Sequence, residues 1–107
     1  MRGKSAEIES KLVGEGIWRK ILAYNEQLMV TEFRFKQGAV VPEHAHPHAQ
    51  TTYLVSGKFR VQLGNEVFDM LPGDAMLADP NVPHTVEVLE DSVAVDSFTP
   101  PREDFLK

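Results

Sequence analysis

The residues best suited to chemistry in this sequence are its histidines. His44, His46 and His48 lie within five positions, and the fourth histidine, His84, stands far downstream. Alternate side chains of a strand point to one side, so His44 and His46 should project together, and Gln50 should return to that side. With His84 supplied by a separate loop, the sequence predicts a nitrogen-rich shell for one divalent transition metal ion, which could be Zn, Fe, Ni, Cu or Mn.

His48 has the same parity as these residues but is not expected to join them. Three successive same-face histidines span roughly 14 Å of strand, so they cannot all reach one ion. We therefore expect His48 at the rim of the site. The alternative is that all of these are surface histidines in a polar loop, but the spacing of two and the distant His84 favour a metal site. The chain has no cysteine, which excludes a thiolate site and a disulfide framework.

Short strands separated by turn residues must position these ligands. The strands that the apolar runs, alternation and turn residues predict cover residues 17–24, 28–35, 51–55, 59–63, 66–71, 75–78 and 92–98. The first two should form a hairpin. Ser56-Gly57 should be a turn, residues 79–83 a rigid loop that delivers His84, and Pro100-Pro101 the end of the sheet. Many short strands with frequent turns predict an all-β sandwich or barrel.

Length and charge limit the remaining possibilities. The 107 residues suit a single domain, 1–107, in which residues 1–16 form a peripheral segment and residues 5–13 could make one or two helical turns. A net charge of −5 without a basic block disfavours nucleic acid and anionic membranes as partners. There is no signal-like or membrane-length apolar run, so we expect a cytoplasmic protein. The exposed edge strands of a small barrel also lead us to expect a homodimer.

Two blocks of the sequence resemble the motifs of the cupin family. The first is Gly38, five residues, His44-Ala45-His46, three residues, Gln50, six residues and Gly57; the second is Gly73-Asp74 with Pro80 and Pro83-His84. Most cupins carry glutamate where Gln50 stands. The resemblance implies a double-stranded β-helix, or jelly-roll barrel, with metal ligands at His44, His46, Gln50 and His84. It does not settle function, because cupins include isomerases, dioxygenases, sugar-binding modules and storage proteins.

A closer resemblance, from Trp18 onward, is to the small cupins of the KdgF type from pectin and alginate degradation. It rests on W-R-K-I-L-A-Y-N (residues 18–25), H-P-H-A-Q-T-T-Y (46–53) and D-S-F-T-P-P-R-E-D-F-L (96–106). Members of that group convert 4,5-unsaturated uronate monosaccharides to the open-chain 5-keto-4-deoxyuronate. The resemblance implies that Asp96, Phe98 and Arg102 complete the site. The chain departs from the group at Ala49, where an acidic residue is frequent.

The chemistry of the residues agrees with this implication. Three neutral imidazoles and the neutral amide of Gln50 leave the charge of a divalent ion uncompensated, so the site should attract a small anionic sugar. A neutral shell also favours a Lewis-acid role over oxygen activation. We expect Asp96 to shuttle a proton, Arg102 to bind the substrate carboxylate through a bidentate pair, and Phe98 to shape the wall.

Each of these residues has a structural alternative. Asp96 could face solvent on an edge strand, Arg102 could pair with Glu103 or Asp104 in the tail, and Phe98 could simply be core. Two other functions stay open at this point. One is a metal-dependent dioxygenase of a small acid, and the other is a non-catalytic sugar-binding cupin.

Overall fold

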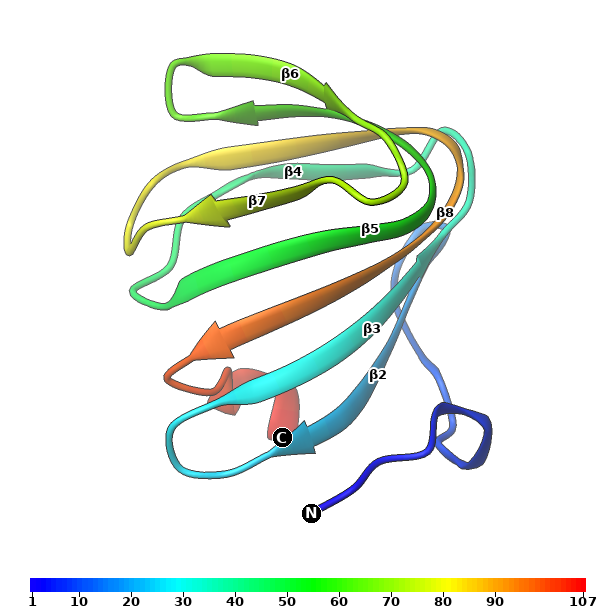
Figure 1. The fold of residues 1–107 in the computed structure, drawn as a ribbon, viewed down its shortest axis with the longest axis vertical. Coiled ribbons are helices and arrows are strands. Elements are labelled where there is room, and N and C mark those ends of the chain that lie inside the picture. Colours follow the sequence, from blue (N-terminus) through cyan, green and yellow to red (C-terminus); the bar gives the residue numbers. More distant parts are fainter.

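Two long antiparallel strands, β5 (Ala49–Leu63) and β8 (His84–Thr99), organise the fold. The structure, a computed structural model, describes residues 1–107. The two strands pair along nearly their whole length, from Ala49 opposite Thr99 to Leu63 opposite His84. Both bend in the middle (Figure 1), so each strand contributes its two halves to two different layers. The bend turns a single eight-stranded sheet into a barrel.

The remaining strands pair with one half of a long strand or extend the sheet beyond it. β3 (Met29–Phe35) and β4 (Val40–His44) lie along the second and first halves of β8, and β7 (Ala75–Ala78) and β6 (Glu66–Met70) along the first and second halves of β5. β2 (Ile17–Tyr24) and β1 (Lys11–Gly14) extend the sheet from β3. Two 3-10 helices, η1 (Ser5–Glu7) and η2 (Glu103–Leu106), flank the strands. The predicted all-β barrel is therefore confirmed.

The bend in β5 corrects the prediction of a turn at Ser56-Gly57. Even-numbered residues up to Leu54 face the interior, whereas Phe59 and the following odd-numbered residues do so beyond the bend. A β-bulge explains this change, because one extra residue shifts the parity without breaking the strand. Gly57 has φ of +92°, and a Cβ there would overlap the Ser92 hydroxyl and the Asp91 carbonyl of β8. Gly57 thus marks a bulge in a continuous strand rather than a turn.

The N-terminal region also differs in part from its prediction. Only Ser5–Glu7 form a helical turn, and Lys11–Gly14 pair with β2 as a strand, which contradicts helical turns up to Val13. The first three residues of β1 are exposed, so no alternation of polar and apolar side chains could reveal the strand. The β2–β3 hairpin is confirmed, and the Asn25 side chain closes it by accepting the backbone N–H groups of Gln27 and Leu28.

Apolar side chains from both layers form the core of the barrel. Eleven buried residues form a single cluster: Ile17, Phe35, Ala39, Leu54, Phe59, Val61, Met70, Met76, Val86, Val88 and Ala94. Further buried positions carry polar side chains, among them Thr31, Gln50, Thr52, His84 and Asp96. The interior thus combines an apolar core with a group of buried polar side chains. None of the helices is long and apolar enough to cross a membrane.

Candidate functional site

Three histidines from two parts of the chain meet inside the barrel. His44 ends β4, His84 begins β8, and the pairing of these two strands places the two residues opposite each other. His46 lies in the loop between β4 and β5 and is 8% exposed. One ring nitrogen of each histidine lies within 4.8 Å of the corresponding nitrogens of the other two. These side chains therefore form a possible site for a metal ion.

The predicted convergence is correct, but its expected cause is wrong. His44 and His46 were expected to project together because side chains alternate along a strand. The structure instead ends β4 at His44 and begins β5 at Ala49, so His46 and His48 lie in a loop. The backbone carbonyl of His46 accepts the N–H of Asn81, at 2.8 Å, which ties this loop to the loop before His84. Loop geometry rather than strand parity brings the rings together.

The second ring nitrogen of each histidine is held by the backbone. Nδ1 of His44, His46 and His84 lies 2.9, 3.1 and 2.9 Å from the carbonyl oxygens of Pro42, His48 and Val82. A carbonyl can only accept, so each Nδ1 carries a proton, and the neutral form of each ring keeps its lone pair on Nε2. This is the arrangement in which histidine binds metals, because the second hydrogen bond fixes both the tautomer and the ring orientation.

His84 fits a ligand role in two further respects. Its Nε2 is buried and has no hydrogen-bond partner in the protein. Burial lowers the pKa of His84, and the neighbouring His44, His46 and Arg102 act in the same direction, while the hydrogen bond to Val82 opposes them. The ring is therefore held neutral with its lone pair directed into a polar cluster. A buried acceptor without a partner is costly unless something occupies the site, and a cation would satisfy it.

Gln50 joins the histidines to an acidic residue. Its amide nitrogen donates to the Thr52 hydroxyl, at 3.1 Å, and to Asp96 Oδ2, at 3.0 Å. The amide oxygen consequently faces His46 and lies 2.9 Å from its Nε2. In the neutral form of His46 with its proton on Nδ1, the Nε2 lone pair would face a lone pair of the amide oxygen. A cation shared by both atoms would remove that repulsion, so the donor set fits a metal ion.

Asp96 faces the interior from β8 and not the solvent. It is 9% exposed, and Oδ1 is buried without a hydrogen-bond partner. Burial raises the pKa of the Asp96 carboxyl to about 7, against the opposing effects of the Thr52 hydroxyl, the Arg102 charge and the Gln50 amide. The Thr31 hydroxyl donates to the Asp96 backbone carbonyl, at 3.1 Å. Asp96 is thus a firmly placed carboxyl group with one free oxygen.

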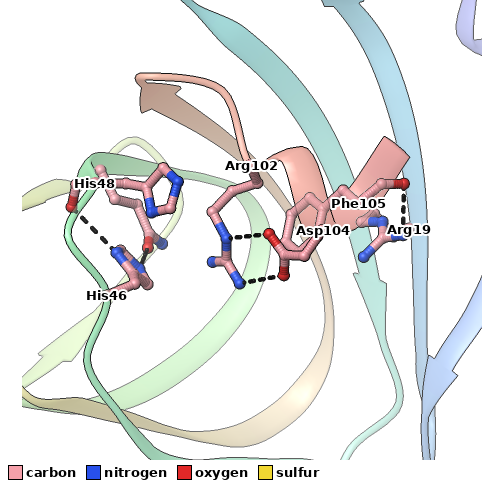
Figure 2. A network of polar contacts seen from close by, with 7 residues as sticks. Arg19, His46, His48, Arg102, Asp104 and Phe105 are labelled. Atoms are coloured by element: carbon pink, nitrogen blue, oxygen red, sulfur yellow. Dashed lines mark hydrogen bonds and ion pairs between the residues drawn. The ribbon is translucent and has the colours of Figure 1, made fainter. Parts of the chain in front are cut away.

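Arg102 and Phe98 lie beside this carboxyl, but Arg102 already has an anionic partner. Its Nε and Nη2 donate to the two oxygens of Asp104, at 3.0 and 2.9 Å (Figure 2). The pairing of Arg102 in the tail, which was the structural alternative, is therefore present in the structure. Phe98 is 2% exposed, and its ring centre lies 6.0 Å from that of His46.

These residues border one large cavity. It has a volume of about 940 Å³, and its lining includes His44, Gln50, His84, Asp96, Phe98 and Arg102. His48, which was expected at the rim, is half-buried, and its ring centre lies 5.4 Å from that of His46. The cavity is large enough for a monosaccharide beside the histidine cluster.

The cavity also contains two residues that the sequence-based prediction missed. Arg19 of β2 and Phe105 of η2 both line it. A signal for Arg19 existed, because Ile17, Arg19 and Ile21 alternate along one strand and a charged residue on an apolar face needs an explanation. For Phe105 there was no comparable signal, since its position depends on the path of the chain after Pro101.

Comparison with known proteins agrees with the fold. The family model described as cupin domain matches residues 31–96. The pectin degradation protein KdgF of Dickeya dadantii is 40% identical over 96 residues, which are 88% of this chain and 87% of that protein. The structure of KdgF from Halomonas sp. has a TM-score of 0.94 and 37% identity, covering 98% of this chain and 97% of that one.

A further similar structure is an RmlC-like cupin from Shewanella frigidimarina. It has a TM-score of 0.94 and 32% identity, covering 97% of this chain and 94% of that one. The predicted jelly-roll barrel and the predicted family are thereby confirmed. The chain belongs to the cupin family and, within it, to the family of the pectin degradation protein KdgF.

Proposed function

We propose that the protein opens the ring of 4,5-unsaturated uronate monosaccharides in a metal-dependent isomerisation that yields 5-keto-4-deoxyuronate. The observation that carries the proposal is the hydrogen bond from Gln50 to Asp96, which joins a buried carboxyl group to the histidine cluster in one cavity. The similarity to a pectin degradation protein supports a substrate of this class. The same chemistry would serve unsaturated uronates released from alginate.

The reaction requires a proton to move and needs no oxidant. The substrate is a cyclic enol ether with a hemiacetal at C1. Its C1 hydroxyl loses a proton and becomes the aldehyde carbonyl as the bond between C1 and the ring oxygen breaks, which leaves the ring oxygen as an enolate at C5. A proton then adds to C4 and the C5 carbonyl forms. Substrate and product are isomers, so one group that first accepts and then returns a proton can complete the conversion.

The histidine cluster and Gln50 would hold the metal ion. His44, His46 and His84 would each contribute Nε2 in the neutral form of the ring, since Nδ1 faces a backbone carbonyl, and Gln50 would contribute its amide oxygen. When bound, the ion supplies Lewis-acid polarisation of a substrate oxygen. All four donors are neutral, so the site keeps a positive charge that suits an anionic sugar.

Asp96 is the residue proposed to move the proton. Its unpartnered Oδ1 is available to a substrate hydroxyl, while Oδ2 is fixed by Gln50. Phe98 forms an apolar wall next to it. This placement favours an enzyme over a purely sugar-binding cupin, because a binding site gains nothing from an unpaired buried carboxyl group.

Arg102 is proposed to contact the substrate carboxylate at the edge of the cavity. Its Nη1 has no protein partner, whereas the other two nitrogens are held by Asp104. Substrate binding by Nε and Nη2 as well would require the substrate to replace Asp104, whose side chain is largely exposed.

The proposal is tested by NMR of the unsaturated uronate with purified protein. The metal-loaded protein should remove the enol-ether signal and produce the open-chain keto acid much faster than the spontaneous reaction, and chelation should abolish the acceleration. Conversion at the spontaneous rate with metal-loaded protein would contradict the proposal, and so would stoichiometric oxygen consumption.

A further inference from the structure

Arg19 is a buried cation without an anionic partner. It points inward from β2, is 9% exposed, and lines the same cavity as the histidine cluster. The ion pairs of the protein involve Lys4, Arg34, Lys58, Arg60 and Arg102, so no carboxylate oxygen lies within 4.0 Å of Arg19. Its one hydrogen bond runs from Nη2 to the Phe105 carbonyl and is 3.5 Å long.

The protein contacts of Arg19 are too weak to compensate its burial. A hydrogen bond at 3.5 Å contributes little. The guanidinium carbon lies 3.9 Å from the centre of the Phe105 ring, and such a cation–π contact is worth about 0.5–2 kcal/mol. A buried charge normally requires a partner of opposite charge. Burial lowers the pKa of Arg19, Asp104 opposes this, and Arg102 adds to it.

Arg102 provides an internal comparison for the same kind of group. Figure 2 shows Arg19 and Arg102 on either side of Phe105, and Arg102 lies 4.3 Å from the ring centre. The two guanidinium groups differ in their partners, because Arg102 binds both oxygens of Asp104 and Arg19 binds none. Arg19 therefore keeps more of its donors open to a ligand than Arg102, whose Nε and Nη2 are both engaged by Asp104.

We propose that Arg19 binds the carboxylate of the sugar substrate together with Arg102, and that Arg19 makes the cavity selective for uronates over neutral sugars. The identity of the ligand rests on the proposed function. The unpaired guanidinium of Arg19 by itself requires only that the ligand place an anionic group next to it. A charge-assisted hydrogen bond from Arg19 would satisfy both the ligand carboxylate and the buried guanidinium.

The test compares three Arg19 variants with an arginine control. Arg19→Gln and Arg19→Met remove the charge, with Met retaining an apolar stem against Phe105, and Arg19→Lys retains the charge. Arg34→Gln is the control, because Arg34 lies on the neighbouring strand β3, faces outward and is exposed. Melting temperatures and metal content establish which variants fold and keep the ion.

Binding is measured by titrating metal-loaded protein with glucuronate and with glucose, which are saturated and therefore not converted. We expect Arg19→Gln and Arg19→Met to bind glucuronate at least about tenfold more weakly than wild type. Arg19→Lys should be intermediate, Arg34→Gln should resemble wild type, and weak glucose binding should not change. Equal glucuronate binding by Arg19→Met, Arg34→Gln and wild type would overturn the proposal, as would a wild-type protein that does not prefer glucuronate to glucose.

Kinetics separate this proposal from the proposed function. With the unsaturated uronate, loss of Arg19 should raise KM about tenfold and change kcat little, which a merely structural role would not produce. Normal turnover with unchanged KM in Arg19→Met would reject the Arg19 subsite and leave the reaction intact. Selective glucuronate binding that depends on Arg19, in a protein without turnover, would reject the reaction and leave the subsite intact.

Discussion

Two groups of side chains in the cavity are held in different ways: the histidine end, which is His44, His46 and His84, and the arginine end, which is Arg19 and Arg102. At the histidine end each ring is fixed by its own backbone, and the donors for a cation are fully oriented before anything binds. At the arginine end Arg102 is held by an exposed aspartate and Arg19 by one long hydrogen bond. The first region is preorganised by the barrel, whereas the second is adaptable and depends on the C-terminal segment. This suggests a division of work between metal binding and substrate recognition.

Removing one histidine should have the largest effect on turnover, and this effect should come from loss of the metal ion. We expect His84→Ala to lose the ion and to lower turnover by about 10³-fold or more, because the Lewis-acid contribution disappears. Elemental analysis and the NMR assay measure the two quantities. Glucuronate binding that depends on Arg19 should weaken less than turnover does. A His84→Ala protein with wild-type metal content would contradict the assignment of His84.

A substitution at the bend of β5 should destabilise the whole barrel, and with it both ends of the cavity. Gly57→Ala would place a Cβ against the Ser92 hydroxyl and the Asp91 carbonyl, at a residue with positive φ. We expect the free energy of unfolding to fall by about 2–4 kcal/mol, measured by urea denaturation. Gly38→Ala is a matched control, because Gly38 also has positive φ but nothing lies within 4 Å of its added Cβ. Equal losses in the two variants would show that close packing against β8 is unimportant.

Removing the anionic partner of Arg102 should have the smallest effect on activity, and it should improve substrate binding rather than weaken it. Asp104→Asn removes the internal anion that competes for the guanidinium fork. The pair is exposed at Asp104, and such ion pairs are worth about 0–1 kcal/mol, so KM should fall about two- to fivefold with kcat nearly unchanged. Steady-state kinetics at low ionic strength give both values. A rise in KM would mean that Asp104 helps to place Arg102 for the substrate rather than competing with it.

The sequence predicted the fold and the histidine end better than the arginine end. Alternating strands and turn residues indicate a barrel, and His44, His46 and His84 are conspicuous by type and spacing. The glycine in Ser56-Gly57 was misread because a glycine with positive φ suits a bulge as well as a turn. β1 was missed because its residues are exposed. These errors concern local geometry and do not affect which side chains meet.

The arginine end was harder to predict because its contacts are made by the tail. The bidentate pair of Arg102 with Asp104 and the packing of Phe105 both depend on where the chain runs after β8. The alternation of side chains along a strand gives no information about the path of this tail. Arg19 could have been noticed as a charge between Ile17 and Ile21 on an inward face, but only tertiary structure reveals that it has no carboxylate partner.

Asp96 connects the two ends, so its substitution tests the account most directly. The measurement is the turnover of Asp96→Asn in the NMR assay, with metal content determined on the same sample. Asparagine keeps the size of the side chain and cannot accept the proton. We predict wild-type metal content with turnover lowered by about 10²–10⁴-fold. Turnover within a few-fold of wild type in a fully metal-loaded Asp96→Asn protein would contradict the assignment of Asp96 as the group that moves the proton.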